Sequence, residues 1–162
     1  MNLWKGFFLW GIASWAAAAD LVVEVAGIDS PEGRVRLWVY DDPAAFAAWK
    51  GPVTLQEARA VAARVRLRVI NLPAGRYAVR LHHDRDGDGE VDRRYGRFAA
   101  EGLGVSGALP PAKADFASAA FDHRADADSI LRIQLHACRP QPRQGWSPRR
   151  AGRPYRPDPE CD

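Results

Sequence analysis

The residues of this chain best suited to chemistry are acidic side chains crowded into one short stretch after a strand-like run. The stretch reads Asp84-Arg-Asp86-Gly-Asp88-Gly-Glu90-Val-Asp92. Calcium takes about six to eight oxygen ligands, and alternate residues of a tight turn can direct carboxylates at one point. We therefore predict a calcium site with water in its remaining positions. Its protein ligands are expected to be the main-chain carbonyl of Glu90 and the side chains of Asp84, Asp86, Asp88 and Asp92.

The predicted site lacks one ligand of an EF-hand loop. Gly89 stands at the sixth position, where the turn is sharpest, but the twelfth position holds Tyr95 in place of a bidentate Glu. This incomplete chelate predicts weak binding, in the range of about 10⁻⁴ to 10⁻³ M seen in extracellular modules. Glu101 completes the shell only if its segment folds back. The alternative is a plain loop in which Asp side chains form Asx turns and Gly permits positive φ.

The sequence offers few catalytic groups. His82 and His83 precede the acidic stretch, and strand alternation puts them on opposite faces, so at most one faces the loop. We expect the histidine that faces the loop to fix it through a hydrogen bond and not to act as a base. Ser106 lies in Gly-Val-Ser-Gly, which lacks the Gly-x-Ser-x-Gly pattern and the strand-to-helix setting of a nucleophile elbow. No catalytic triad can be assembled, and we expect a protein that is not an enzyme.

Strands must position these residues, because apolar residues recur with period two in most of the chain. This alternation, which places apolar side chains on one face of a strand, occurs in residues 21–25, 35–39, 65–69, 77–81 and 131–135. Turn residues separate the segments, notably at 29–33 and 71–75. Strands with one apolar face pack as two sheets. We therefore predict an all-β fold, an antiparallel, Greek-key-like β-sandwich of about seven strands.

Helix is scarce in the sequence. Asp42 and Pro43 have the residue types of an N-cap and a first helical position, and we expect one short helix after the second strand. Thr54 and Glu57 have the spacing of a capping box, but we favour an extended path there. The segment 93–123 is rich in glycine, which indicates turns and loops.

The N-terminal residues have the composition of a secretory signal. Lys5 supplies a positive charge, residues 6–18 are uncharged and mostly apolar, and the small residues Ala17, Ala18 and Ala19 lie directly before Asp20. The apolar run is shorter than the roughly 20 residues that span a bilayer. We predict a signal peptide over residues 1–19 that is cleaved before Asp20. No transmembrane segment is then left, and the mature protein is periplasmic or extracellular.

The C-terminal residues differ from the rest in charge. Residues 139–162 hold six arginines against three acidic residues and many prolines, which predicts a disordered tail after a sandwich domain of residues 20–138. Export exposes Cys138 and Cys161 to an oxidising environment. A disulfide between them and two unpaired thiols both remain open.

Arginines are frequent on the polar faces of the expected strands. They are Arg34, Arg36, Arg64, Arg66, Arg68, Arg76 and Arg80. We favour arginine stems that cover apolar sheet while the charged heads stay hydrated, over an anion-binding surface. Export and the near-neutral charge of residues 20–138 argue against nucleic acid as a partner.

The motifs of residues 20–136 resemble those of a known family. Asn-Leu-Pro-Ala-Gly-Arg-Tyr at 71–77, His-Asp-x-Asp-x-Asp-Gly-x-x-Asp at 83–92, Glu-Gly-x-Gly-x-Ser at 101–106 and Phe-x-x-Ala-x-Phe at 116–121 occur in order. This order resembles the DUF2141 family of exported bacterial proteins, which has no established biochemical role. The resemblance implies an Ig-like or prealbumin-like sandwich, and His83 matches a position of the family motif, so we expect His83 to be the histidine that fixes the loop. Family members typically have asparagine at the positions of Asp86 and Asp88, so this chain carries extra negative charge in the loop.

These features lead to two functional hypotheses. The first is an uncharacterised, exported, non-catalytic module that has a weak structural calcium site and binds another protein or a surface of the cell envelope. The alternative is a small-molecule or metal-handling carrier. It requires a pocket between the Asp-rich loop and the Gly-rich segment, beside Glu101 and Ser106.

Overall fold

The computed structural model describes residues 18–61, 63–94 and 98–137. The expected disordered tail, the cysteines Cys138 and Cys161, and all but the last two residues of the expected signal peptide lie outside the described residues. These expectations stay predictions.

Ten strands and two short helices make up the described chain. In chain order they are β1 (Ala18–Ala26), β2 (Arg34–Tyr40), α1 (Pro43–Ala48), β3 (Thr54–Arg59), β4 (Arg64–Pro73), β5 (Gly75–Asp84), β6 (Arg93–Arg94), β7 (Phe98–Ala99), β8 (Gly102–Val105), α2 (Phe116–Ala119), β9 (Phe121–His123) and β10 (Ser129–Gln134). All five segments predicted from alternation are strands, and the segment after Thr54 is extended as expected. Among the described residues, no helix is long and apolar enough to cross a membrane.

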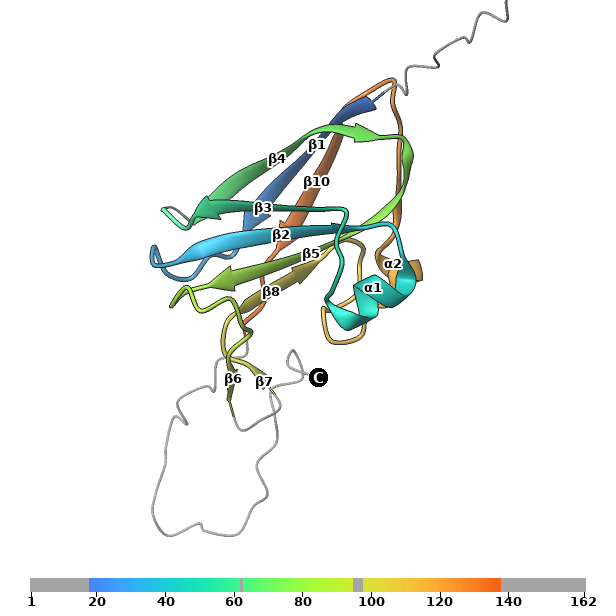
Figure 1. The fold of residues 1–162 in the computed structure, drawn as a ribbon. Helices are drawn as coiled ribbons and strands as arrows, with labels where there is room; N and C mark the ends of the chain where they lie inside the picture. Colours follow the sequence, from blue (N-terminus) through green and yellow to red (C-terminus); the bar gives the residue numbers. More distant parts are fainter. Residues whose placement is uncertain (1–17, 62, 95–97, 138–162) are drawn as a thin grey trace, which may run out of the picture.

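Two sheets face each other as the layers of a sandwich (Figure 1). One has the strand order β10-β1-β4, and the other has the order β3-β2-β5-β8, with β9 also paired to β5. Strands β6 and β7 form a separate pair. The pairs are antiparallel except for β1 and β10, which join the two ends of the domain in parallel. The predicted all-β fold of antiparallel strands is confirmed, and the parallel pair is an addition to it.

Strand β5 positions both regions of interest. At its N-terminal end it pairs with the end of β2 that leads into α1, and at its C-terminal end it runs into the acidic loop. Helix α1 begins as predicted, because Oδ1 of Asp42 accepts a hydrogen bond from the Ala45 amide at 2.7 Å and Pro43 follows the cap. Helices α1 and α2 lie together beside one end of the larger sheet (Figure 1).

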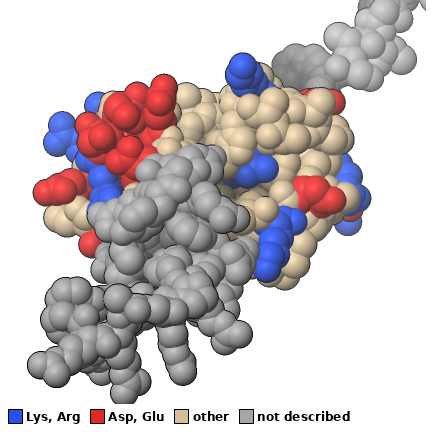
Figure 2. Space-filling model, turned by 90° about the horizontal axis from the view of Figure 1, so that it is seen from below, with Lys and Arg blue, Asp and Glu red and all other residues tan. Residues whose placement is uncertain are grey.

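Charged side chains cover the outward face of the smaller sheet and pair across its strands. Glu24 of β1 forms ion pairs with Arg66 of β4 and with Arg132 of β10, and Asp20 forms one with Arg68. The two pairs of Glu24 are exposed and add little stability, so their arginines mainly keep the sheet surface hydrated, whereas Asp20 is a buried carboxylate. Seen from below, basic and acidic side chains are interspersed except for one dense acidic group (Figure 2).

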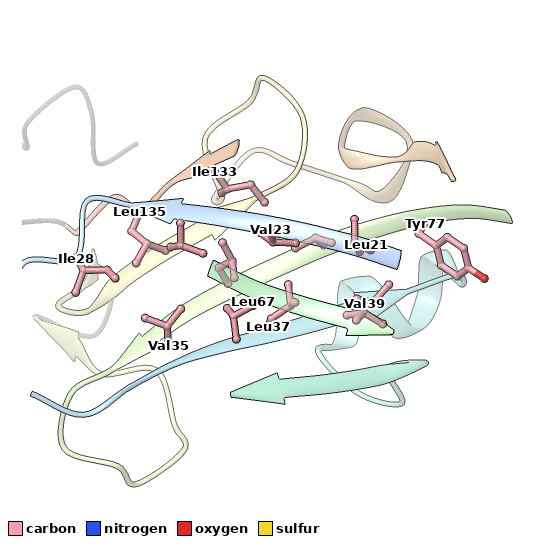
Figure 3. Close-up of a cluster of buried hydrophobic side chains, with 14 of the residues drawn as sticks. Leu21, Val23, Ile28, Val35, Leu37, Val39, Leu67, Tyr77, Ile133 and Leu135 are labelled. Atoms are coloured by element: carbon pink, nitrogen blue, oxygen red, sulfur yellow. The ribbon is translucent and has the colours of Figure 1, made fainter. Parts of the chain in front are cut away.

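The core lies between the two sheets (Figure 3). Leu21 and Val23 of β1 belong to the same buried cluster as Val35, Leu37 and Val39 of β2, and all five are fully buried. Alternation along each strand places these residues inward, as the sequence predicts. Burial of this apolar surface is the main source of stability for the domain.

The glycine-rich segment does not form only loops, and this part of the prediction was wrong. Gly102 to Val105 form β8, which pairs with β5 and lies close to the end of β10. A Cβ atom on Gly104 would lie 2.9 Å from Cγ2 of Ile133 and 3.1 Å from Cδ2 of Leu135. The glycine therefore permits the close approach of another strand, a role that glycine has in strand interiors as well as in turns.

We expect Leu37→Ala to lower the free energy of unfolding by about 3 kcal/mol, because it opens a cavity in a fully packed core. Ile130→Ala is the matched control, since Ile130 is an apolar strand residue that is 60% exposed; its effect should stay within about 0.5 kcal/mol. Equilibrium unfolding in urea measures both. Equal losses for the two variants would contradict the assigned core.

Candidate functional site: the aspartate loop between β5 and β6

The aspartate loop, residues 84–92, starts at a buried carboxylate. Asp84 is the last residue of β5 and is fully buried. Its Oδ1 accepts a hydrogen bond from the Gly87 amide at 2.8 Å, and its Oδ2 accepts one from the Gly89 amide at 3.1 Å. The Asp84 side chain thus binds two amides of the turn that follows it, as Asp side chains commonly do in turns.

Gly89 has the left-handed conformation that the sequence predicted for the sixth loop position. Its φ angle is 83°, a value that side chains with a Cβ rarely adopt. A Cβ atom there would also lie 2.6 Å from Nη1 of Arg36. The position thus requires glycine for its backbone conformation and for the space beside it.

Three of the predicted ligands come together in the loop. Asp84, Asp86 and Asp88 each offer a carboxylate oxygen, and these atoms all lie within 4.8 Å of one another. Two oxygens on opposite sides of a calcium ion, at about 2.4 Å each, are separated by about the same distance. Asp86 and Asp88 are exposed, and Figure 2 shows acidic side chains gathered on the side of the molecule where this loop lies in Figure 1.

The other two predicted ligands are placed differently. The carboxylate of Asp92 is not part of the group of three, and its amide donates to Oε2 of Glu101 at 3.2 Å. The amide of Glu90 donates to Oδ1 of Asp88 at 2.7 Å. The role of the Glu90 carbonyl as a ligand stays a prediction.

The side chain of Arg36 neutralises part of the negative charge of the loop. Nη1 of Arg36 lies 3.4 Å from Oδ2 of Asp84, while Nε of the same side chain lies 2.7 Å from Oε1 of Glu57. Burial alone would raise the pKa of Glu57, but its bonds to Arg34 and Arg36 outweigh burial and hold that pKa below its usual value. Arg36 therefore bridges two carboxylates and competes with any metal for Asp84.

Glu101 holds both ends of the loop. The side chain is almost completely buried. Its Oε1 accepts a hydrogen bond from the Arg85 amide at 2.8 Å, and its Oε2 accepts one from the Asp92 amide at 3.2 Å. Burial favours a raised pKa for Glu101, but these amides and the ring of His82 together lower it. The segment folds back, which was the condition for Glu101 to complete the calcium shell, but its carboxylate binds main-chain amides of the loop.

The histidine that supports the loop is His82, and the expectation that His83 does so was wrong. Nε2 of His82 lies 2.7 Å from Oε2 of Glu101, and its ring stacks on Trp38 with centroids 6.1 Å apart. His83 points to the other face of β5, where its Nε2 donates to the Glu32 carbonyl at 2.9 Å. The spacing of two between His82 and Asp84 was the signal for a shared face.

The side chain of Ser106 is bound to main-chain groups. Its Oγ accepts a hydrogen bond from the Val79 amide at 2.8 Å and donates one to the Ala119 carbonyl at 2.6 Å. The residue is buried. Ser106 therefore ties the loop after β8 to β5 and α2.

Two cavities lie near the glycine-rich segment and the two helices. One is lined by the loop of residues 107–111 and by β10, and the other is lined by α1, α2 and Arg80. Neither includes a residue of the aspartate loop. The pocket that the carrier hypothesis places between the two loops is not one of them.

The fold and the loop define a small β-sandwich protein with three convergent aspartates at one end of its larger sheet. A family model described as "Uncharacterized protein conserved in bacteria (DUF2141)" matches residues 23–130. The chain belongs to this family, and the resemblance noted in the sequence is confirmed. The searches of curated proteins and of solved structures found no match.

We expect Glu101→Gln to lower the free energy of unfolding by about 2 kcal/mol at pH 7, because two loop amides and the buried ring of His82 lose a charged partner. A carboxylate with a lowered pKa in the folded state stabilises the protein above its usual pKa, here 4.5. This stabilisation disappears as the pH falls through the lower, folded pKa. The difference between wild type and variant should therefore shrink below pH 4.5. Urea unfolding at several pH values measures it.

Glu32→Gln serves as the control for Glu101→Gln, because Glu32 is exposed. It should leave the free energy of unfolding unchanged at every pH. A Glu101→Gln variant as stable as wild type at pH 7 would contradict the assigned role of Glu101.

Proposed function

We propose that this chain is an exported, non-catalytic binding or accessory module of the bacterial cell envelope with a weak structural calcium site in the aspartate loop. The observation that carries the proposal is the convergence of Asp84, Asp86 and Asp88 within 4.8 Å on a loop closed by Glu101. Calcium bound there would order the outer part of the loop. Its role would be stabilisation of a surface and not a switch.

The donor set fits calcium in number, charge and spacing. Each ionised carboxylate has about four acceptor sites, so Asp84 keeps capacity for a cation while it accepts two amides. Asp86 and Asp88 are exposed and add two further charges. A cation there relieves the repulsion among the three carboxylates. The Glu90 carbonyl, Asp92 and water are the proposed remaining ligands.

Several features keep the proposed affinity low. The ion pair with Arg36 weakens the attraction of Asp84 for calcium, and the twelfth loop position offers no carboxylate. Two of the three ligands are hydrated in the free protein and must be ordered on binding. We therefore propose a dissociation constant in the range of about 10⁻⁴ to 10⁻³ M.

The proposal of a non-catalytic protein is supported by how the polar groups are used. His82 and Glu101 form a close pair, but both are almost completely buried and the pair holds the loop. The hydroxyl of Ser106 is bound to main-chain groups on both sides. A catalytic role would require these polar groups to be accessible to a substrate, but their hydrogen bonds are made to other parts of the fold.

Export and the envelope partner are proposed from composition. The charge at Lys5, the apolar run and the alanines before Asp20 have the pattern of a cleaved signal. The basic tail of residues 139–162 is suited to contact an anionic envelope surface. We propose a protein or surface of the envelope as the partner and not nucleic acid.

Calcium at 10 mM should raise the midpoint of thermal unfolding by about 3 to 8 °C over the value in chelator, as expected for a ligand at some tenfold excess over its dissociation constant. The double variant Asp86→Asn, Asp88→Asn should lose most of this shift. Asparagine keeps the oxygen acceptors that bind the Asp88 and Glu90 amides, so the midpoint in chelator should stay within about 2 °C. Differential scanning fluorimetry measures both midpoints.

Asp122→Asn is the matched control, because its side chain is 79% exposed and lies outside the loop. It should show the full calcium shift. An unchanged midpoint of the wild-type protein in calcium, or an equal shift in the double variant, would show that the loop is a plain Asx turn.

A further inference from the structure

Arg80 is a buried cation at the other end of the same sheet face. It is 6% exposed, and its guanidinium carbon lies 3.8 Å from the ring centroid of Phe46 and 4.3 Å from that of Trp49. Its Nε donates to the Phe46 carbonyl at 3.1 Å. Stacking on both rings orients the guanidinium plane.

No carboxylate of the described residues pairs with Arg80. Arg36 and Arg66, which also lie on outward sheet faces, differ from it in this respect, since Arg36 pairs with Glu57 and Arg66 pairs with Glu24. The terminal nitrogens of Arg80 have no acceptor among the described residues, because its one hydrogen bond is made by Nε. Burial lowers the pKa of Arg80 to about 10, so the group is charged at neutral pH. A largely buried charge without an anionic partner is stabilised when an anion pairs with it.

A second polar group near Arg80 lacks a partner among the described residues. Tyr40 is fully buried, and its hydroxyl has no hydrogen-bond partner there. The register of β2 and β5 places Tyr40 opposite Ala78, next to Arg80 on the same sheet face. Unpaired buried polar groups are rare in folded proteins and call for an explanation.

An open pocket of about 460 Å³ lies beside Arg80, between α1 and α2. Its walls are mostly apolar, with Pro43, Phe46 and Ala47 from the α1 side and Phe116 from the α2 side. A pocket of this size with apolar walls and few polar groups is typical of small-molecule sites.

We propose that this pocket binds a small monocarboxylate with an apolar body. The guanidinium of Arg80 pairs with the carboxylate, and the rings of Phe46 and Phe116 contact the hydrocarbon. A planar carboxylate matches the planar fork of arginine, which can donate two parallel hydrogen bonds. The ligand supplies the negative charge that the protein does not provide.

The pocket selects against a second negative charge. Asp115 is also part of its wall, and this carboxylate caps α2 by accepting a hydrogen bond from the Ser118 amide at 2.8 Å. Its bonds to the Ser118 side chain and amide lower the pKa of Asp115, so it is ionised at neutral pH. A dicarboxylate or a phosphate would face this charge with a single arginine to balance it.

The inference is independent of the calcium proposal. The pocket shares no residue with the aspartate loop. Calcium binding can fail while carboxylate binding holds, and the reverse is equally possible.

Isothermal titration calorimetry of the full chain with phenylacetate and octanoate tests the proposal. We expect dissociation constants of about 1 mM or lower, typical of small ligands in a partly open pocket. Phenylacetamide and octanamide have the same shape without the charge and should bind at least tenfold more weakly.

Arg80→Met should weaken phenylacetate binding at least tenfold while the midpoint of thermal unfolding stays equal to wild type or rises. Arg76→Met is the matched control and should bind as wild type does, because the Arg76 side chain is 59% exposed and lies outside the pocket. Ala117 is an exposed residue of α2 in the pocket wall. Ala117→Trp therefore fills the pocket without changing Arg80 and should also abolish binding. It decides the question if Arg80→Met does not fold.

Three results would overturn the proposal. The first is that neither carboxylate binds the wild type at a ligand concentration tenfold above the expected dissociation constant. The second is that acid and amide bind equally well. The third is that Ala117→Trp leaves binding unchanged.

Discussion

The carboxylate of Glu101 joins three parts of the chain that are otherwise separate in sequence. It accepts hydrogen bonds from the amides at both ends of the aspartate loop and contacts the buried ring of His82. These bonds connect β5, the loop and the segment that enters β8. Without them, the buried ring of His82 and two partly buried main-chain amides would lose their acceptor. An unsatisfied polar group costs about 1 to 3 kcal/mol where it is fully buried. The shape of the acidic loop therefore depends on a residue outside it.

The outward face of the larger sheet carries two polar regions separated by aromatic rings. Trp38 stacks on His82 at one side and contacts Trp49 edge-on at the other, with centroids 5.8 Å apart. Trp49 in turn lies over the guanidinium of Arg80. Negative charge gathers beyond His82, and the unpaired positive charge lies beneath α1. One strand, β5, thus supplies Arg80, His82 and Asp84 from successive outward positions, each with a different electrostatic environment.

Much of this architecture follows from local sequence. Period-two alternation predicts the five strands β1, β2, β4, β5 and β10. Asp42 and Pro43 predict the start of α1, and Gly89 predicts the left-handed turn of the loop. Each of these signals depends on interactions within a few residues, so the sequence alone is enough to predict the local structure.

The features that sequence reasoning missed depend on contacts between distant segments. Gly104 indicates a turn by its type, yet it lies in a strand because β10 approaches there. The choice of His82 over His83 depends on which face of β5 the Glu101 segment covers. The sequence also does not reveal that Arg80 lacks an acidic partner among the described residues, because arginines at similar positions pair with acids on neighbouring strands. Strand register decides all three, and register is a tertiary property.

Amide hydrogen exchange at Arg85 and Asp92, followed by NMR in calcium-free buffer, tests the central role of Glu101 most directly. If the buried carboxylate holds the loop, both amides exchange at least about 100-fold more slowly than in an unstructured peptide, before any metal is added. Exchange at the peptide rate without calcium, with protection appearing only when calcium is added, would contradict the account. The metal and not Glu101 would then organise the loop.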